Sequence, residues 1–203
     1  MPIRDCAVVA VEGTAAAGKT TLVHALAAHY REQGVNVTAT GEPARVSPFM
    51  EEIVLHNKGD FDLVAELDTF AVQLTTTMRA ARNHSLLITD KTPANVLAYA
   101  RLVLDQDDPH VRAVLRSVES LCNSWMPLAY EAVIHCRDHY DQEAGGDRFR
   151  AKVLDLQDET ETAVYEAIRA TGVPVLDLPQ GLTTQARVEW IAKALHGNGI
   201  NVH

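Results

Sequence analysis

The sequence predicts an α/β fold in three layers, with helices on both faces of a doubly wound, five-stranded parallel sheet. Five short apolar runs alternate with amphipathic helical patterns, which is the order typical of parallel sheets covered by helices. The length of 203 residues suits one such domain, with a core that needs no disulfide bonds. Because no repeat, low-complexity segment or linker divides the chain, we expect residues 1–203 to form a single domain.

The first strand is predicted at 7–11, where apolar residues follow one another without interruption. A glycine-bounded loop at 13–20 follows it. Apolar residues then recur at helical spacing until Gly34, which is expected to end the first helix. Residues 35–40 alternate in polarity and are rich in β-branched types, which predicts a second strand ending at a Gly-Glu-Pro turn.

Two helices are predicted before the third strand. Ser47 and Pro48 provide an N-cap and a first-turn proline for a short helix that runs to about residue 56. Apolar residues at helical spacing between Leu63 and Met78 predict a long amphipathic helix. The short apolar run at 86–90 is typical of a buried parallel strand.

The second half of the chain continues the alternation. A polar segment at about 137–152 contains two adjacent glycines and is expected to be flexible. A proline near the start of the last strand occupies a position that strands tolerate. The remaining predicted elements are helices over 92–104, 111–121, 153–170 and 183–195, and strands over 132–135 and 173–178.

Charge and cysteine content narrow the classes of partner. Eighteen Lys and Arg against 27 Asp and Glu give a formal net charge of −9, which argues against nucleic acid as the main partner. The three cysteines, Cys6, Cys122 and Cys136, have no metal-ligand spacing and fit reduced thiols. No apolar stretch is long enough to span a membrane. We therefore expect a cytoplasmic protein without a membrane or nucleic-acid partner.

The loop between the first strand and the first helix carries the most specific motif. Its glycines let successive N–H groups surround an anion, and the following helix adds the positive end of its dipole. The lysine supplies a mobile charge for the outer phosphates, and the threonine after it supplies a hydroxyl for magnesium. The motif predicts a nucleoside triphosphate site rather than a plain glycine turn before a helix. Its residues are Gly13, Thr14, Ala15, Ala16, Ala17, Gly18, Lys19, Thr20 and Thr21.

Polar side chains at the ends of two strands are candidates for phosphoryl-transfer chemistry. Asp90 ends the third strand, where ligands bind in open α/β sheets, and is expected to hold magnesium together with Thr20 rather than only to cap a turn. Glu42 follows the second strand and could take the proton of an attacking hydroxyl, or be a loop glutamate. Lys91 could pair with a phosphate, or be a solvated surface lysine.

Two further segments offer candidate contacts. Gln73 on the long helix could hydrogen-bond a flat, amide-bearing ligand, or be a half-exposed helix residue. Arg148 and Arg150 in the polar segment are predicted to close as a lid over bound phosphates, where they would neutralise transition-state charge and exclude water. The alternative for these arginines is a charged helix N-terminus in solvent.

These motifs resemble the thymidylate-kinase and deoxynucleoside-kinase branch of the P-loop kinases. The similarity runs from about residue 8 to residue 178. The resemblance implies Mg-ATP as the donor, a nucleoside or nucleoside monophosphate as the acceptor, and a homodimer. Its residues are Glu12-Gly13 before the loop, Glu42-Pro43, Asp90 followed by a cation, Leu97-Ala98-Tyr99-Ala100, and Asp147-Arg148-Phe149 in the lid.

The chain also departs from both groups. Thymidylate kinases carry arginine at three positions where this chain has other residues. Arginine recognises phosphate in a bidentate way that lysine cannot copy, so the absence of these arginines puts recognition of thymidine monophosphate in doubt. Deoxynucleoside kinases carry a glutamate and a glutamine that match Glu42 and Gln73, but their third-strand signature begins Glu-Arg. The resemblance therefore implies a diverged member with an unusual acceptor. The residues that stand where thymidylate kinases carry Asp or Arg are Ala15, Gly41, Leu74 and Lys91.

We therefore expect an ATP- and magnesium-dependent phosphotransferase that moves the γ-phosphate to a small acceptor. Acceptor contacts are expected from Glu42, Gln73 and Lys91. One alternative is a nucleotide-hydrolysing regulatory ATPase with a protein partner, but the sequence contains no guanine-reading motif and no extra oligomerisation domain to support it. The other alternative is a nucleotide-binding module without turnover. The residues expected to be catalytic are Lys19, Glu42, Asp90, Arg148 and Arg150.

Overall fold

The computed structural model describes residues 5–13, 16–56, 60–138, 140 and 157–200. The strands are β1 (Ala7–Glu12), β2 (Val37–Thr40), β3 (Leu86–Asp90), β4 (Ala132–Cys136) and β5 (Val175–Leu178). The helices are α1 (Lys19–Glu32), the 3₁₀ turn η1 (Pro43–Arg45), α2 (Pro48–Val54), α3 (Leu63–Ala81), α4 (Pro93–Val103), α5 (Pro109–Ala129), α7 (Gln157–Ala170) and α8 (Thr184–Gly197).

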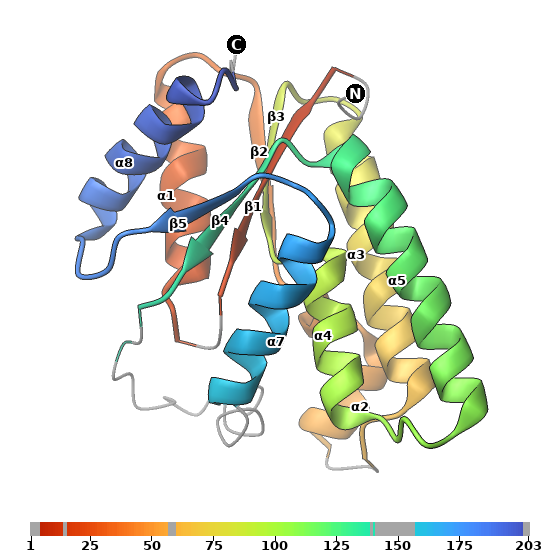
Figure 1. Cartoon of the computed structure of the whole chain (residues 1–203). Helices are drawn as coiled ribbons and strands as arrows, with labels where there is room; N and C mark the ends of the chain where they lie inside the picture. Colours follow the sequence, from red (N-terminus) through yellow and green to blue (C-terminus); the bar gives the residue numbers. More distant parts are fainter. Residues whose placement is uncertain (1–4, 14–15, 57–59, 139, 141–156, 201–203) are drawn as a thin grey trace.

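The five strands form one parallel sheet in the order β2-β3-β1-β4-β5 (Figure 1). Strand β1 is central, because Val9 lies opposite Ile88 of β3 on one side and Ala132 of β4 on the other. The chain thus moves first to one side of β1 and later to the other. Open α/β sheets bind ligands beyond the carboxyl ends of their strands at such a reversal.

Helices cover both faces of this sheet, which confirms the predicted three-layer α/β fold. Helices α1 and α8 lie on one face, and α3, α4, α5 and α7 lie on the other (Figure 1). Leu22, Leu26 and Ile191 are buried in the first of these layers, and Leu97 and Met126 in the second. The strands are buried from both sides, which explains why they form continuous apolar runs in the sequence.

Two predicted elements have different bounds in the structure, by two residues at the start of β2 and by eight at the end of α5. The second strand begins at Val37 rather than at residue 35, because the N–H of Val35 donates to the carbonyl of Tyr30 at 3.0 Å and closes the end of α1. The helix predicted over 111–121 continues to Ala129 in α5. Its Pro127 is exposed in the last turn, where a missing N–H removes a single helical hydrogen bond.

The long helix α3 confirms the predicted helix but buries a different face from the apolar stripe. Val64, Leu67 and Met78 are among the exposed apolar side chains, at 54%, 37% and 41% exposure. Glu66 and Gln73 are instead buried, at 5% and 3%. The face of α3 that meets the rest of the fold is therefore partly polar, and it lies near the carboxyl end of β3, as the contacts of Gln73 show below.

No helix in the part of the chain that the structure describes is both long and apolar enough to cross a lipid bilayer.

Candidate functional site

The loop after β1 turns through two glycines that no other residue could replace without strain. Gly13 has a φ of +141°, and a Cβ atom there would lie 2.3 Å from the carbonyl oxygen of Cys136 at the end of β4. Gly18 has a φ of +74° and directly precedes the first residue of α1. Ala16 between them is also left-handed, with a φ of +59°. The tight turn therefore delivers the positive end of the α1 dipole to the carboxyl edge of the sheet.

Lys19 begins α1 as a buried side chain among charged neighbours. Burial lowers the pKa of Lys19, and the charge of Lys91 lowers it further. The carboxylates of Asp90, Glu42 and Glu12 raise it. A lysine in this position lies where the ends of β1, β2 and β3 converge, which is the place that the phosphate-loop motif requires.

Thr20 and Asp90 form a pair that suits a magnesium ion. The hydroxyl of Thr20 donates a hydrogen bond of 2.9 Å to Oδ2 of Asp90. Oδ1 of Asp90 is buried and has no hydrogen-bond partner among the described residues. Hydroxyl and carboxylate oxygens are the ligands that Mg²⁺ prefers, and magnesium is usually held by few protein groups and several waters. The donor set therefore fits the ion that the sequence predicts.

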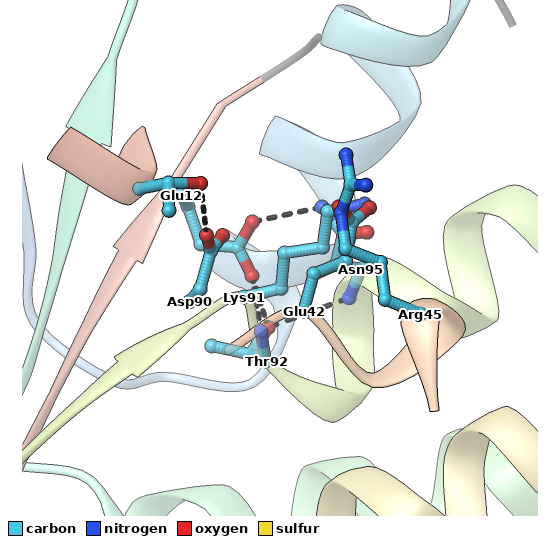
Figure 2. A network of polar contacts seen from close by, with 8 residues as sticks. Glu12, Glu42, Arg45, Asp90, Lys91, Thr92 and Asn95 are labelled. Atoms are coloured by element: carbon cyan, nitrogen blue, oxygen red, sulfur yellow. Dashed lines mark hydrogen bonds and ion pairs between the residues drawn. The ribbon is translucent and has the colours of Figure 1, made fainter. Parts of the chain in front are cut away.

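Glu42 forms ion pairs with two cations just beyond β2 (Figure 2). Its Oε1 lies 2.7 Å from Nζ of Lys91, and its Oε2 lies 3.0 Å from Nε of Arg45. Lys91 is the main cause of the pKa of Glu42 falling to about 2, although burial opposes the change. Burial by itself would lower the pKa of Lys91, but Glu42, Tyr99 and Asp90 outweigh it and the pKa is raised. Both side chains are therefore charged at neutral pH.

The backbone at Lys91 is held in a strained conformation. Its φ is +76°, which is uncommon for a residue with a long side chain. The N–H of Lys91 donates to the carbonyl of Val11 at 3.1 Å, and its own carbonyl accepts from Gln73 Nε2 at 2.9 Å and from the Thr89 hydroxyl at 3.0 Å. Strain that is held by several contacts is typical of functional sites. Gln73 thus contacts the backbone that positions Lys91, and a contact of its own with a ligand stays a prediction.

Glu12 anchors the start of α4 to the end of β1 (Figure 2). Its fully buried Oε1 accepts from the N–H and from the hydroxyl of Thr92, at 2.6 Å each, and its Oε2 accepts from the amide of Asn95 at 2.8 Å. Burial raises the pKa of Glu12, while these hydrogen bonds and the charges of Lys91 and Lys19 oppose the rise. The carboxylate therefore ties two neighbouring segments of the site together.

The sequence did not single out Arg187 of α8, which reaches the phosphate loop. Its Nη1 donates to the carbonyl of Ala17 at 3.3 Å, and its guanidinium forms an ion pair with Asp138. The same guanidinium lies 5.1 Å from the centre of the Tyr140 ring, and the N–H of Tyr140 donates to the carbonyl of Ala16 at 3.2 Å. Arg187 is buried, so it supports the loop from behind rather than as a free surface cation.

Two side chains on α3 and α4 were given no role by the sequence: Glu66 was not singled out, and Tyr99 was named only as part of a family motif. Glu66 of α3 is 5% exposed, and burial raises its pKa to about 7. Tyr99 of α4 lies under Lys91, whose Nζ is 5.0 Å from the ring centre. Burial raises the pKa of Tyr99. A glutamate inside a mostly apolar helix pattern was the one available signal for the first of these residues.

The predicted residues fall into three groups. Lys19, Thr20, Glu42, Asp90 and Lys91 are brought together at the carboxyl ends of β1, β2 and β3. Gln73 joins them through the backbone of Lys91. The predicted loop residues Thr14 and Ala15 and the predicted lid arginines Arg148 and Arg150 lie outside the described residues.

No cluster of three or more His, Cys, Asp or Glu side chains that could hold a metal ion is found within the described ranges. A magnesium ion bound through one carboxylate, one hydroxyl and a phosphate does not need such a cluster.

Comparison with known proteins places the chain among the P-loop folds. The model of a family described as AAA domain matches residues 8–187. No curated protein sequence matches the chain significantly.

Two solved structures share the fold at low sequence identity. The NadR protein in complex with NR superposes with a TM-score of 0.72 and 19% identity, over 99% of this chain and 54% of that protein. The chain therefore spans about half the length of NadR. Thymidylate kinase from Candida albicans superposes with a TM-score of 0.68 and 14% identity, over 96% of this chain and 93% of the kinase. These similarities confirm a diverged P-loop kinase fold.

Proposed function

The chain belongs to the AAA domain family, and we propose that it is an ATP- and magnesium-dependent kinase for a small acceptor. The acceptor is a nucleoside or a nucleoside monophosphate. One observation carries the proposal: Lys19, Thr20 and Asp90 meet at the phosphate loop, directly beside the ion pair of Glu42 and Lys91. A donor site and an acceptor site therefore share one edge of the sheet.

The donor side depends on the loop and the first turn of α1. Backbone amides at Gly18 and in the first turn of α1 would bind the β- and γ-phosphates, and Lys19 would neutralise their charge. Thr20 and Asp90 would hold Mg²⁺, which, when bound, offsets charge that develops on the phosphates during transfer. Arg187 keeps the loop in shape through its contact with the carbonyl of Ala17.

The acceptor side depends on Glu42 and Lys91. The acceptor hydroxyl oxygen forms a bond to the γ-phosphorus while the bond from that phosphorus to the β–γ bridging oxygen breaks, and ADP leaves. A carboxylate with a pKa of about 2 is a weak base, so Glu42 orients the hydroxyl and takes its proton only as the new bond forms. Lys91, held rigidly by its backbone contacts, faces the migrating phosphoryl group.

Structural similarity supports this proposal without identifying the acceptor. NadR was solved with NR, and the other matching structure is a thymidylate kinase, so nucleosides and nucleotides are the natural compounds to test.

The test is a transfer assay with ATP labelled at the γ-phosphate. Label should move to one member of a panel of nucleosides, NR among them, and nucleoside monophosphates, and the transfer should require Mg²⁺. Lys19→Met should lower kcat by about 10²–10³-fold, as expected for loss of a preorganised charge. Lys193→Met, at an exposed position of α8, is the matched control and should leave turnover unchanged.

Two results would contradict the proposal. Normal turnover by Lys19→Met would contradict the assignment of this loop as the phosphate-binding site. Steady ATP hydrolysis that no acceptor accelerates would instead indicate a regulatory ATPase.

A further inference from the structure

Glu66 lies in the acceptor region but has no assigned role in the transfer. It is on the same face of α3 as Gln73, two turns nearer the start of the helix. Since Gln73 contacts the end of β3, Glu66 lies about 10 Å farther along α3, toward the start of the helix. Glu66 is also close enough to Lys91, on the acceptor side, for the charge of Lys91 to lower its pKa.

Glu66 is 5% exposed as a residue, and its carboxylate forms no hydrogen bond to any described residue. The hydrocarbon part of the side chain lines a small cavity of about 10 Å³ together with eight apolar side chains, among them Leu63, Phe70 and Val96. A buried carboxylate without donors is costly, and proteins tolerate such groups mainly where a ligand supplies the partner. The carboxylate of Glu66 can therefore accept a hydrogen bond from a ligand.

The charged neighbours of Glu66 come from several elements. Lys91 at the end of β3 lowers its pKa, while Asp62 at the start of α3 raises it. Tyr99 of α4 is close enough for the charge of Glu66 to raise the pKa of its phenol. Burial has the largest effect and brings the pKa of Glu66 to about 7, so the carboxylate is ionised above neutral pH.

The cations on the acceptor side are already engaged by a carboxylate. Lys91 and Arg45 both pair with Glu42, at 2.7 Å and 3.0 Å. A phosphate on the incoming acceptor would have to displace Glu42 from these cations while facing a second carboxylate, Glu66. An uncharged acceptor with hydroxyl or N–H donors meets no such opposition.

We propose that Glu66 determines acceptor specificity: its carboxylate accepts a hydrogen bond from a hydroxyl or N–H group of an uncharged nucleoside, and its charge opposes acceptors that already carry a phosphate. This inference rests on the proposed kinase activity and selects one of its two acceptor classes. The step itself is the transfer described above, in which a nucleoside hydroxyl gains the phosphoryl group and ADP leaves.

The test compares kcat/KM for nucleosides and their 5′-monophosphates at pH 8, with saturating Mg-ATP. The wild-type protein should prefer the nucleoside by about tenfold or more. Glu66→Gln keeps the shape of the side chain and should raise the KM for the nucleoside by about 10- to 100-fold, the loss of one hydrogen bond to a charged group. It should change kcat much less. Its discrimination against monophosphates should fall.

Two variants and one binding measurement complete the design. Glu52→Gln on the exposed side of α2 is the matched control and should behave like the wild type. Glu66→Asp keeps the charge and should retain the discrimination against monophosphates. Calorimetric titration with Mg-ATP should give the same Kd for the wild type and Glu66→Gln, which shows that the donor site and the fold are intact.

The outcomes separate the two proposals. A wild-type protein that prefers monophosphates, or a Glu66→Gln variant with an unchanged KM for nucleosides, would overturn the role of Glu66 and leave the kinase assignment standing. Failure of the wild type to bind Mg-ATP, or to phosphorylate any acceptor, would overturn both.

Discussion

The hydroxyl of Thr20 donates a hydrogen bond of 2.9 Å to Oδ2 of Asp90, which joins the first turn of α1 to the end of β3. The two residues are 70 positions apart in the chain and meet only because β1 and β3 are neighbours in the sheet. The other oxygen of Asp90 is buried without a partner among the described residues. We therefore expect Asp90 to contribute directly to the binding of Mg²⁺.

Asp90→Asn should weaken the use of magnesium while preserving the fold. The amide can still accept the hydrogen bond from Thr20, but it lacks the negative charge that favours a divalent cation. We expect the Mg²⁺ concentration for half-maximal activity to rise about 10- to 100-fold. The measurement is a magnesium titration of the transfer assay. Asp105→Asn, on the exposed turn after α4, is the control, and an equal effect in both variants would contradict the role of Asp90.

The ion pair between Glu42 and Lys91 should contribute measurably to stability. Their side chains are only 23% and 13% exposed, so solvent screens the pair weakly. A double-mutant cycle with Glu42→Gln and Lys91→Met should give a coupling energy of about 1–3 kcal/mol in urea unfolding. The pKa of Glu42, about 2, lies below its ordinary value of 4.5, so the wild type should lose this contribution as the pH falls from 4.5 to 2.

A second pair in the same protein provides the control for this cycle. Arg101 and Glu119 lie 2.7 Å apart, but their side chains are 35% and 38% exposed. Arg101→Met and Glu119→Gln should couple by about 0.5 kcal/mol or less. Similar coupling in the two cycles would show that burial does not strengthen the Glu42–Lys91 pair.

The sequence predicted the sheet and the strand-end site because both depend on local patterns. Buried parallel strands are continuous apolar runs, and Leu86–Asp90 was predicted with the bounds that the structure gives. Asp90, Lys91 and Glu42 follow such strands directly. Once the strands are placed, the parallel topology brings these residues together at one edge.

Residues that contribute from helices could not be predicted in the same way. Arg187 contacts the carbonyl of Ala17, which is 170 positions away in the chain, and no local pattern encodes that distance. On α3 the apolar stripe predicted the wrong buried face, because Val64 is exposed while Glu66 is buried. Which face of a helix is buried depends on its neighbours, and here the buried face borders a polar site.

Gly13→Ala should be severely destabilising. The new Cβ would lie 2.3 Å from a backbone oxygen of Cys136, and a backbone atom at the end of a central strand cannot move aside cheaply. The φ of +141° adds strain for any residue with a side chain. We expect a loss of about 3–5 kcal/mol in the free energy of unfolding, measured by urea denaturation.

Gly34→Ala separates the two causes of that loss. Gly34 has a φ of +84°, but a Cβ there would meet no atom within 4 Å. Only the backbone penalty remains, so the expected loss is about 1–2 kcal/mol. Equal losses at Gly13 and Gly34 would mean that the close approach to Cys136 carries no cost.

Glu66 should make the protein less stable as the pH rises. Burial raises its pKa from the ordinary value of 4.5 to about 7, so between these two values the folded state binds the proton more tightly than the unfolded state does. Its stabilising contribution is fully present below pH 4.5 and is lost as the pH rises through 7.

Glu66→Gln cannot ionise, so its free energy of unfolding should rise relative to that of the wild type by up to about 3 kcal/mol between pH 4.5 and pH 8. Urea unfolding of both proteins across this range measures the difference, and Glu52→Gln should show no such trend. A constant difference between the wild type and Glu66→Gln would mean that the carboxylate of Glu66 is not held in an environment that disfavours its charge.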